Sequence, residues 1–413
     1  MNSNDAEYNV LNLLLTCPDL QAFIFDNCDV NLFRNKTLAR IFELSKELFL
    51  AGEDIDNIAI YEKSGRDKDV SDALVVILCD VSASKTLIKS YCKLLFKQKL
   101  NDMISSAKND EDLERIEHFK QKYDFSISKV QHISENMPEF EEIYKVYQGT
   151  SIVTGYPELD EAIGSFRGGD FITLGASTGT GKTSIALNIA RQVCMQGKHV
   201  LYCSLEMPID QLRNRFICIN ERLNALKFRN FTFTKEEKEL YKQGMASLKD
   251  WYLNILTDYQ LTPEKLKIYA SELKEQNKLD FVVIDYLGLM SGYNNRSLYE
   301  KTSIMSRKIK CLATELNIPI LVLVQLNREF KNRQDKRPIL SDIRESGAIE
   351  QDSDFIFFAH REYMYNPAAK PNELEILLAK NRHGASKLSF NLYFDVQTQY
   401  IASYEWGASN DDF

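Results

Sequence analysis

Six short apolar runs, separated by stretches with helical character, most limit how this 413-residue chain folds after Gly149. Runs of this kind are typical of strands buried on both faces. Their alternation with helices predicts an α/β domain with a mostly parallel sheet. The stretch 388–403 mixes polar with apolar residues, so we expect an antiparallel hairpin there, at the sheet edge. The six runs are 171–174, 200–203, 281–284, 320–324, 355–358 and 374–378.

The first hundred residues have a different pattern, because their apolar side chains recur at helical spacing. Leu38, Ile41 and Phe42 are one example of residues that share a helix face. The pattern predicts a small all-helical domain over 1–100. A second domain, which holds the sheet, is then expected over 149–413.

The segment between these domains, 101–148, is predicted to be a helical linker. Charged residues dominate its first part, which is typical of a solvated helix or a connector. Near its end, four apolar residues at i, i+3, i+4 and i+7 give one short helix an apolar stripe. The pattern fits packing on its own chain and docking on a neighbouring subunit equally well. The four residues are Phe140, Ile143, Tyr144 and Tyr147.

Composition excludes several classes of protein. No apolar run reaches 18 residues and the opening residues are polar, so we expect neither a membrane span nor a signal peptide, and a cytoplasmic location. The eight cysteines form no C-x-x-C pair and several lie in apolar runs, which favours buried reduced thiols over disulfides or zinc. The net charge of −8 means that a nucleic-acid site would have to be a local patch.

One segment carries a phosphate-binding motif in the context that such a motif requires. It follows the apolar run 171–174 directly and leads into a helical pattern. Small residues let consecutive backbone N–H groups surround phosphate oxygens, and the start of a helix adds its dipole. Lys182 would neutralise the phosphates and Thr183 would offer a hydroxyl to Mg²⁺. The predicted ATP-binding residues are Ser177, Thr178, Gly179, Thr180, Gly181, Lys182 and Thr183.

Polar residues also stand at the carboxyl ends of other predicted strands, where open α/β sheets bind ligands. Asp285 follows the run 281–284 and is predicted to hold Mg²⁺ through water. Glu206 follows the strand at 200–203 and is predicted to polarise the water that attacks the γ-phosphate. Gln325 is predicted to sense that phosphate. Each alone is equally well explained as a cap on a neighbouring helix, but the joint pattern favours catalysis.

Two cations end the sixth apolar run. Lys380 and Arg382 are two positions apart, so a strand would point both side chains to the same face. A solvated sheet edge would explain them. The alternative is an arginine finger, a residue that stabilises the charge of phosphoryl transfer and raises turnover by about 10³-fold or more.

These motifs resemble those of the DnaB-type replicative helicases over about 154–394. In that family the glutamate is the catalytic base, and the basic pair reaches the ATP of the adjacent subunit. The resemblance therefore implies a RecA-like P-loop ATPase domain after a short, divergent helical collar. A phage-encoded and a cellular member fit equally well. The segments that carry the resemblance are 202–208, 284–287, 324–328, 341–352 and 379–384.

The stretch 341–352 is the most family-specific of these segments. In DnaB-type proteins it forms a loop that faces the pore of a hexamer and contacts the phosphates of single-stranded DNA, which implies DNA contacts at Arg344, Glu345 and Gly347. Backbone N–H groups and an arginine grip phosphates without reading bases. A surface ion pair between Arg344 and Glu345 is the plain alternative. A second candidate contact is Arg296, where a solvated loop is an equally good reading.

The resemblance implies a homohexameric helicase that uses ATP and Mg²⁺ to move along single-stranded DNA, 5′ to 3′, and unwinds duplex at the replication fork. Primase, a helicase loader and single-strand-binding protein are the partners that it implies. The expected location is the bacterial cytoplasm, including that of a phage-infected host. Two other functions stay open: a RecA-like recombinase, and an ATP-gated DNA-binding loading scaffold.

Overall fold

The computed structural model of the protein describes residues 3–81, 83–106, 112, 115, 119, 141, 149–293, 296–327, 330, 333–343 and 347–404. The chain forms two compact units, Met1–Met137 and Pro138–Phe413. Our boundaries of 100 and 149 stay a prediction. The predicted apolar stripe, at 140, 143, 144 and 147, lies outside the described residues.

The described part of the N-terminal unit consists of helices joined by loops, with no strand, as the sequence predicts. Helix α3 shows why: Asn35 caps its first N–H groups through its side chain, Gly52 ends it at a φ of 78°, and Leu38 and Ile41 are buried. The helices are α1 (Ser3–Thr16), α2 (Pro18–Asn27), α3 (Lys36–Ala51), α4 (Asn57–Lys63), α5 (Lys68–Val75) and α6 (Ile88–Ser106), with short turns η1 (Val30–Leu32), η2 (Val76–Asp80) and η3 (Lys85–Leu87).

The second unit is built on one sheet in the order β3-β2-β4-β5-β1-β6-β7-β8-β9. The first six strands in that order are parallel, and β7, β8 and β9 are antiparallel to their neighbours. The strands are β1 (Phe171–Ala176), β2 (Val200–Ser204), β3 (Leu253–Leu256), β4 (Phe281–Asp285), β5 (Ile320–Gln325), β6 (Phe355–His360), β7 (Glu373–Asn381), β8 (Leu388–Asp395) and β9 (Tyr400–Ser403).

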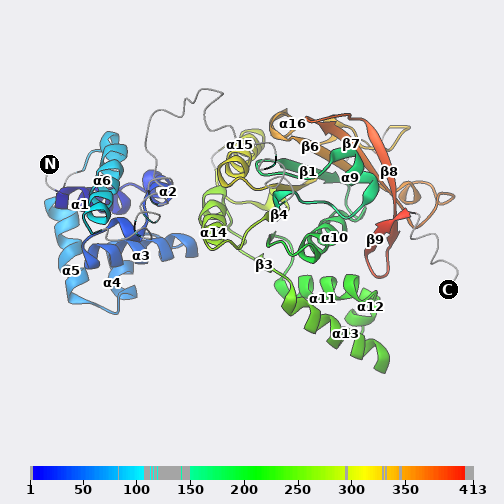
Figure 1. Cartoon of the computed structure of the whole chain (residues 1–413), viewed down its shortest axis with the longest axis horizontal. Helices are drawn as coiled ribbons and strands as arrows, with labels where there is room; N and C mark the ends of the chain where they lie inside the picture. Colours follow the sequence, from blue (N-terminus) through cyan, green and yellow to red (C-terminus); the bar gives the residue numbers. More distant parts are fainter. Residues whose placement is uncertain are drawn as a thin grey trace. The chain divides into compact units, whose positions relative to one another are not determined.

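Helices cover both faces of the parallel part of the sheet (Figure 1). Alternate residues of β4 show the two layers, because Val283 joins the core with α10 and α11, and Val282 joins the core with α14 and α15. The flanking helices are α9 (Pro157–Ile163), α10 (Lys182–Met195), α11 (Ile209–Asn220), α12 (Ala225–Arg229), α13 (Lys235–Ser247), α14 (Pro263–Glu275), α15 (Leu298–Leu316) and α16 (Gly347–Asp352), with short turns η4 (Leu248–Asp250), η5 (Leu287–Leu289), η7 (Leu340–Asp342) and η8 (Glu362–Met364).

The predicted mostly parallel sheet is confirmed, although the direction of one strand was predicted wrongly and another strand was not predicted. The run 374–378 forms β7, which is antiparallel to β6. A parallel return usually runs through a crossover helix, and here the connection 361–372 holds only the short turn η8. Strand β3 was missed, because it lies at the edge and none of its residues is fully buried. The predicted edge hairpin is confirmed as β8 and β9.

Six of the eight cysteines are buried thiols, as predicted. The prediction is wrong for Cys79 and Cys311, which are exposed. Among the described residues, no helix has both the length and the apolar character that a membrane span needs. The same residues hold no cluster of three histidine, cysteine or acidic side chains that would bind a metal.

Candidate nucleotide site

The phosphate-binding segment joins the end of β1 to the start of α10, the strand-loop-helix arrangement that the motif needs. Gly179 and Gly181 have φ values of 84° and 110°, which glycine adopts without strain. A Cβ at Gly181 would also lie 3.0 Å from the ring of Phe394. Glycine is therefore needed at 181 for its backbone and for the close approach of Phe394.

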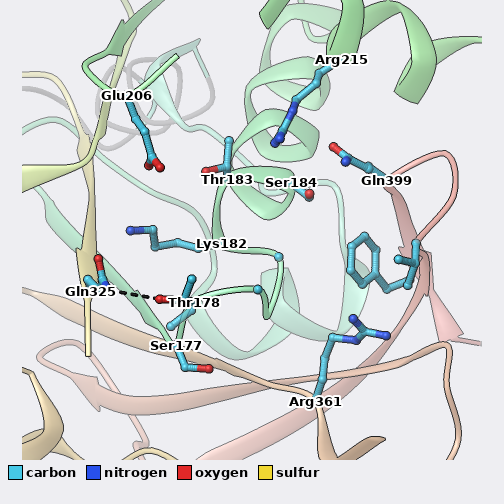
Figure 2. Close-up of a pocket in the computed structure, with 15 residues that line it drawn as sticks. Ser177, Thr178, Lys182, Thr183, Ser184, Glu206, Arg215, Gln325, Arg361 and Gln399 are labelled. Carbon is cyan, nitrogen blue, oxygen red and sulfur yellow. Dashed lines mark hydrogen bonds between the residues drawn. The ribbon is translucent and has the colours of Figure 1, made fainter. Parts of the chain in front are cut away.

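Side-chain hydrogen bonds fix the shape of this loop. The hydroxyls of Ser177 and Thr180 lie 2.7 Å apart. Nε2 of Gln325 donates to the Thr178 hydroxyl at 3.1 Å (Figure 2), because the parallel register places Gln325 beside Ala176. The predicted sensor residue is thus attached to the loop that would hold the phosphates.

Lys182 points into the cavity between Glu206 and Gln325 (Figure 2). Its Nζ lies 4.3 Å from the centre of the Tyr286 ring. Burial lowers the pKa of Lys182, and the negative charges of Asp285 and Glu206 oppose that shift. The charged ammonium is therefore incompletely compensated in this cavity, and an anionic phosphate would supply the missing partner.

Asp285 is buried at the end of β4 and has one free acceptor. Its Oδ2 accepts a hydrogen bond from the Tyr202 hydroxyl at 3.0 Å, whereas Oδ1 has no partner among the described residues. A buried carboxylate oxygen without a donor is costly. A water molecule of a hydrated Mg²⁺ would satisfy it, and Thr183 lines the cavity into which Lys182 points. These residues fit a Mg²⁺ ion, which would neutralise phosphate charge.

We expect Asp285→Asn to lower ATP turnover about 100-fold or more, because an amide no longer attracts the hydrated cation. Turnover measured across a Mg²⁺ titration tests this. Tyr202→Phe is the matched control, since it removes the hydrogen bond to Oδ2 and keeps the carboxylate. It should cost less than about tenfold. Equal losses in both variants would assign Asp285 a structural role.

Glu206 lies at the mouth of the cavity, across from Lys182 (Figure 2). Strand β2 ends two residues before it, and the N–H of Leu205 donates to the Asp285 carbonyl at 2.9 Å. This bond fixes the backbone that carries Glu206. The side chain itself is exposed, so it has access to water.

The cavity has a volume of about 300 Å³ and extends to residues that the sequence analysis missed. The guanidinium of Arg361 lies 5.1 Å from the centre of the Phe394 ring, within cation–π range. Arg361 directly follows β6, so the rule that selected the other strand ends would have found it. Phe394 gave no such signal, because it lies in β8, within an edge hairpin. The missed lining residues are Ser184, Arg215, Arg361, Phe394, Val396 and Gln399.

The predicted basic pair lies at the opposite end of the sheet. Lys380 and Arg382 flank Asn381, which pairs with Phe355 at the start of β6, whereas the phosphate loop follows the end of β1. Arg382 forms an ion pair with Asp354 at 3.3 Å. The two cations therefore do not join this chain's own phosphate site.

Two of the predicted DNA contacts, Arg344 and Glu345, lie outside the described residues. Gly347 starts α16, and a Cβ there would lie 3.6 Å from the Tyr299 hydroxyl in the first turn of α15. Arg296 stands two residues before α15 and is exposed. Its Nη1 lies 3.7 Å from Oε1 of Glu300. The two segments predicted to bind DNA thus lie next to each other.

Two family models match the chain. The DnaB-like helicase C terminal domain matches residues 151–403, and the DnaB-like helicase N terminal domain matches residues 1–97. The chain belongs to the DnaB-like helicase family. The alternatives of a recombinase and a loading scaffold are not favoured.

Relatives and solved structures agree with this family. The replicative helicase DnaB of Buchnera aphidicola (subspecies Baizongia pistaciae) is 30% identical over 97% of this chain and 95% of its own length. That of Geobacillus stearothermophilus is 38% identical over 57% of this chain, and the match spans about half, 53%, of that protein. The match to the Bacillus subtilis replicative helicase likewise spans 53% of its length.

A solved DnaB-like replicative helicase, described with its interactions with primase, has a TM-score of 0.62 and 25% identity. The similarity covers 97% of this chain and 99% of that one. A solved ATPase domain has a TM-score of 0.60 and 29% identity, over 64% of this chain and 97% of its own. The predicted fold class, a RecA-like α/β domain after a helical N-terminal region, is confirmed for this DnaB-like chain.

Proposed function

We propose that this DnaB-like chain is a replicative DNA helicase that couples ATP hydrolysis to movement along single-stranded DNA, 5′ to 3′, and to unwinding of duplex at the replication fork. The observation that carries the proposal is the convergence of Lys182, Glu206 and Gln325 on one cavity at the carboxyl ends of the parallel strands. The buried Asp285 ends the neighbouring strand β4, and its charge acts on Lys182. The match of both DnaB-like family models supports the helicase assignment.

The chemistry follows from the positions of these side chains. The phosphate loop and Lys182 would bind the β- and γ-phosphates, and Asp285 and Thr183 would hold the hydrated Mg²⁺. Glu206, which is exposed to solvent where it lines the cavity, would orient the attacking water and accept its proton. Gln325 would report loss of the γ-phosphate to the loop through Thr178, to which it is hydrogen-bonded at 3.1 Å.

The basic pair supports a ring of identical subunits. Lys380 and Arg382 lie at the end of the sheet away from their own phosphate loop, so a neighbouring chain in a head-to-tail ring would have to supply the nucleotide that they contact. We assign them to the ATP of the next subunit of a homohexamer. Hydrolysis would then depend on the geometry between subunits.

DNA contact is assigned to Arg344, Glu345, Gly347 and Arg296. The start of α16 lies beside the start of α15, which supports a single contact surface for both segments. Phosphate contacts made there would be independent of base sequence. Movement of this surface along one strand would exclude the other strand and open the duplex. Primase, a helicase loader and single-strand-binding protein stay candidate partners.

A forked-duplex assay tests the proposal. Two substrates are compared, one with only a 5′ single-stranded arm and one with only a 3′ arm. With ATP and Mg²⁺, the first should be unwound and the second should not. Mass measurement with and without nucleotide should give six subunits. Slow hydrolysis that ignores DNA, with no strand displaced, would contradict a helicase.

We assign Arg361 and Phe394 to the nucleoside part of ATP. They lie in the phosphate cavity, and the flat guanidinium over the ring offers a surface for stacking. Arg361→Ala should raise the KM for ATP about tenfold and change kcat little, since the contact is equal in ground and transition states. Arg213→Ala, an exposed arginine of α11 paired with Asp210, is the control. A fall in kcat alone would contradict the assignment.

A further inference from the structure

Asp354 occupies a fixed position at the amino end of the sheet, directly before β6. Its N–H donates to the Phe171 carbonyl at 2.8 Å, and its Oδ2 accepts from the Phe171 N–H at 2.8 Å. Only 5% of its side-chain surface is exposed. The carboxylate is therefore attached to the first residue of the central strand β1 and has little freedom to move.

This buried carboxylate lies between two cations. Nζ of Lys310 lies 2.6 Å from Oδ2, and Nη1 of Arg382 lies 3.3 Å from Oδ1. The backbone N–H of Arg382 also donates to the Asp354 carbonyl at 2.9 Å. Arg382 is thus held to Asp354 through its backbone and its side chain.

Backbone carbonyls of α16 also hold the basic pair. Nη2 of Arg382 donates to the Gln351 carbonyl, and Nζ of Lys380 donates to the Glu350 carbonyl at 2.5 Å. Burial, and then the charge of Arg382, lower the pKa of Lys380, so the charge of Arg382 disfavours that of Lys380. An anion beside them offsets that repulsion. Arg382 keeps 45% of its side chain exposed, which leaves it open to a partner outside the chain.

We propose that Asp354 is a positioning residue that holds Arg382 in the orientation needed to reach the nucleotide of the adjacent subunit. The inference rests on the proposed shared site. A free arginine side chain would lose several rotamers on each engagement, whereas one whose guanidinium is already held loses fewer. The alternative is that Asp354 only stabilises the fold through Phe171 and Lys310.

The first test variant is Asp354→Asn, which removes the charge and keeps an acceptor for the Phe171 N–H. Because Lys310 would then lose its counter-charge in a largely buried site, a second variant combines Asp354→Asn with Lys310→Met and removes both charges together. In full-length protein with single-stranded DNA, both should lower kcat about tenfold or more. The Kd for a fluorescent ATP analogue should stay within about twofold of that of the unchanged protein, since the chain's own phosphate site is not altered.

The matched control is Asp170→Asn. Asp170 is another buried carboxylate next to β1. Its Oδ2 accepts from the Arg167 N–H at 2.7 Å, and its Oδ1 lies 3.6 Å from Nε2 of His383. It forms no ion pair with Arg382. The kcat of the Asp170→Asn variant should stay within about twofold of the kcat of the unchanged protein. A loss equal to that of Asp354→Asn would show that any buried charge at this sheet end matters, and would overturn the proposal.

Mixed rings separate positioning from folding. Subunits with Glu206→Ala lack their own catalytic base but keep an intact basic pair, so they should restore turnover at the phosphate sites of Asp354→Asn subunits. A fold defect within the Asp354→Asn chain would give no rescue. The mixture of Arg382→Ala with Glu206→Ala subunits is the reference. If this mixture regains turnover but neither Asp354 variant does when mixed with Glu206→Ala, only the positioning role of Asp354 is overturned. If the reference mixture itself stays inactive, the shared site is overturned.

Discussion

Lys182→Ala should abolish ATP hydrolysis, and with it unwinding of a forked duplex, while the fold is retained. In the cavity, Nζ of Lys182 offsets the carboxylates of Asp285 and Glu206, so without it a bound triphosphate would face negative charge. Loss of one preorganised charge at a phosphoryl-transfer site costs about 10²- to 10³-fold or more in turnover. Phosphate release and strand displacement measure the two losses.

The fold should survive this change for a physical reason. Burial lowers the pKa of Lys182, so its charged form is held in the folded protein at a cost that alanine removes. We therefore expect an unchanged or slightly higher Tm and an unchanged ring mass. Lys198→Ala is the control, because Lys198 lies before β2, at the other end of the sheet, and donates to the Gly149 carbonyl. Unwinding by Lys182→Ala at more than a trace would overturn the nucleotide assignment.

Buried strands and strand-end side chains were predictable because their signals are local. Runs such as 281–284 have no polar side chain, and parallel register then brings their last residues to the same end of the sheet. This is why Gln325 lies beside the phosphate loop, as the register of β1 with β5 requires. The sequence therefore predicted most of the sheet and the cluster around Lys182.

Strand direction and edge strands were not predictable in this way. The run 374–378 has the apolar content of a buried strand, but its direction depends on the structure of the connection before it, which holds no crossover helix. In the structure its residues alternate between buried and half-buried. Strand β3 pairs with one neighbour and is half-buried, so its pattern resembles that of a loop.

The nucleoside side of the cavity depends on packing between distant segments. Arg361 stands at the end of β6, but its partner Phe394 comes from β8, in a hairpin whose pattern indicates only an edge. The carboxylate that holds Arg382 was also missed. Asp354 precedes a strand, and a residue at a strand start carries no signal of catalysis in sequence. Such contacts appear only when the topology brings β1, β6 and β7 together.

Arg382→Ala should lower ATP turnover by about 10³-fold without weakening ATP binding. The position of Arg382, at the far end of the sheet from its own phosphate loop, means that the loss concerns the neighbour's nucleotide. kcat should fall while the Kd of a fluorescent ATP analogue stays within about twofold. Arg337→Ala is the matched control, because its guanidinium is paired with Glu375 on β7 and is not part of the basic pair.

Rings assembled from two variants test most directly whether Arg382 acts on the nucleotide of the neighbouring subunit. In a ring assembled from equal amounts of Arg382→Ala and Glu206→Ala subunits, about a quarter of the interfaces pair an intact phosphate site with an intact basic pair, if the subunits mix at random in a head-to-tail ring. Hydrolysis should therefore recover to at most about that fraction, although each variant alone is inactive. Because no single chain in the mixture is repaired, any recovery must come from sites that two subunits share. A mixture as inactive as its components would place Arg382 outside the catalytic site.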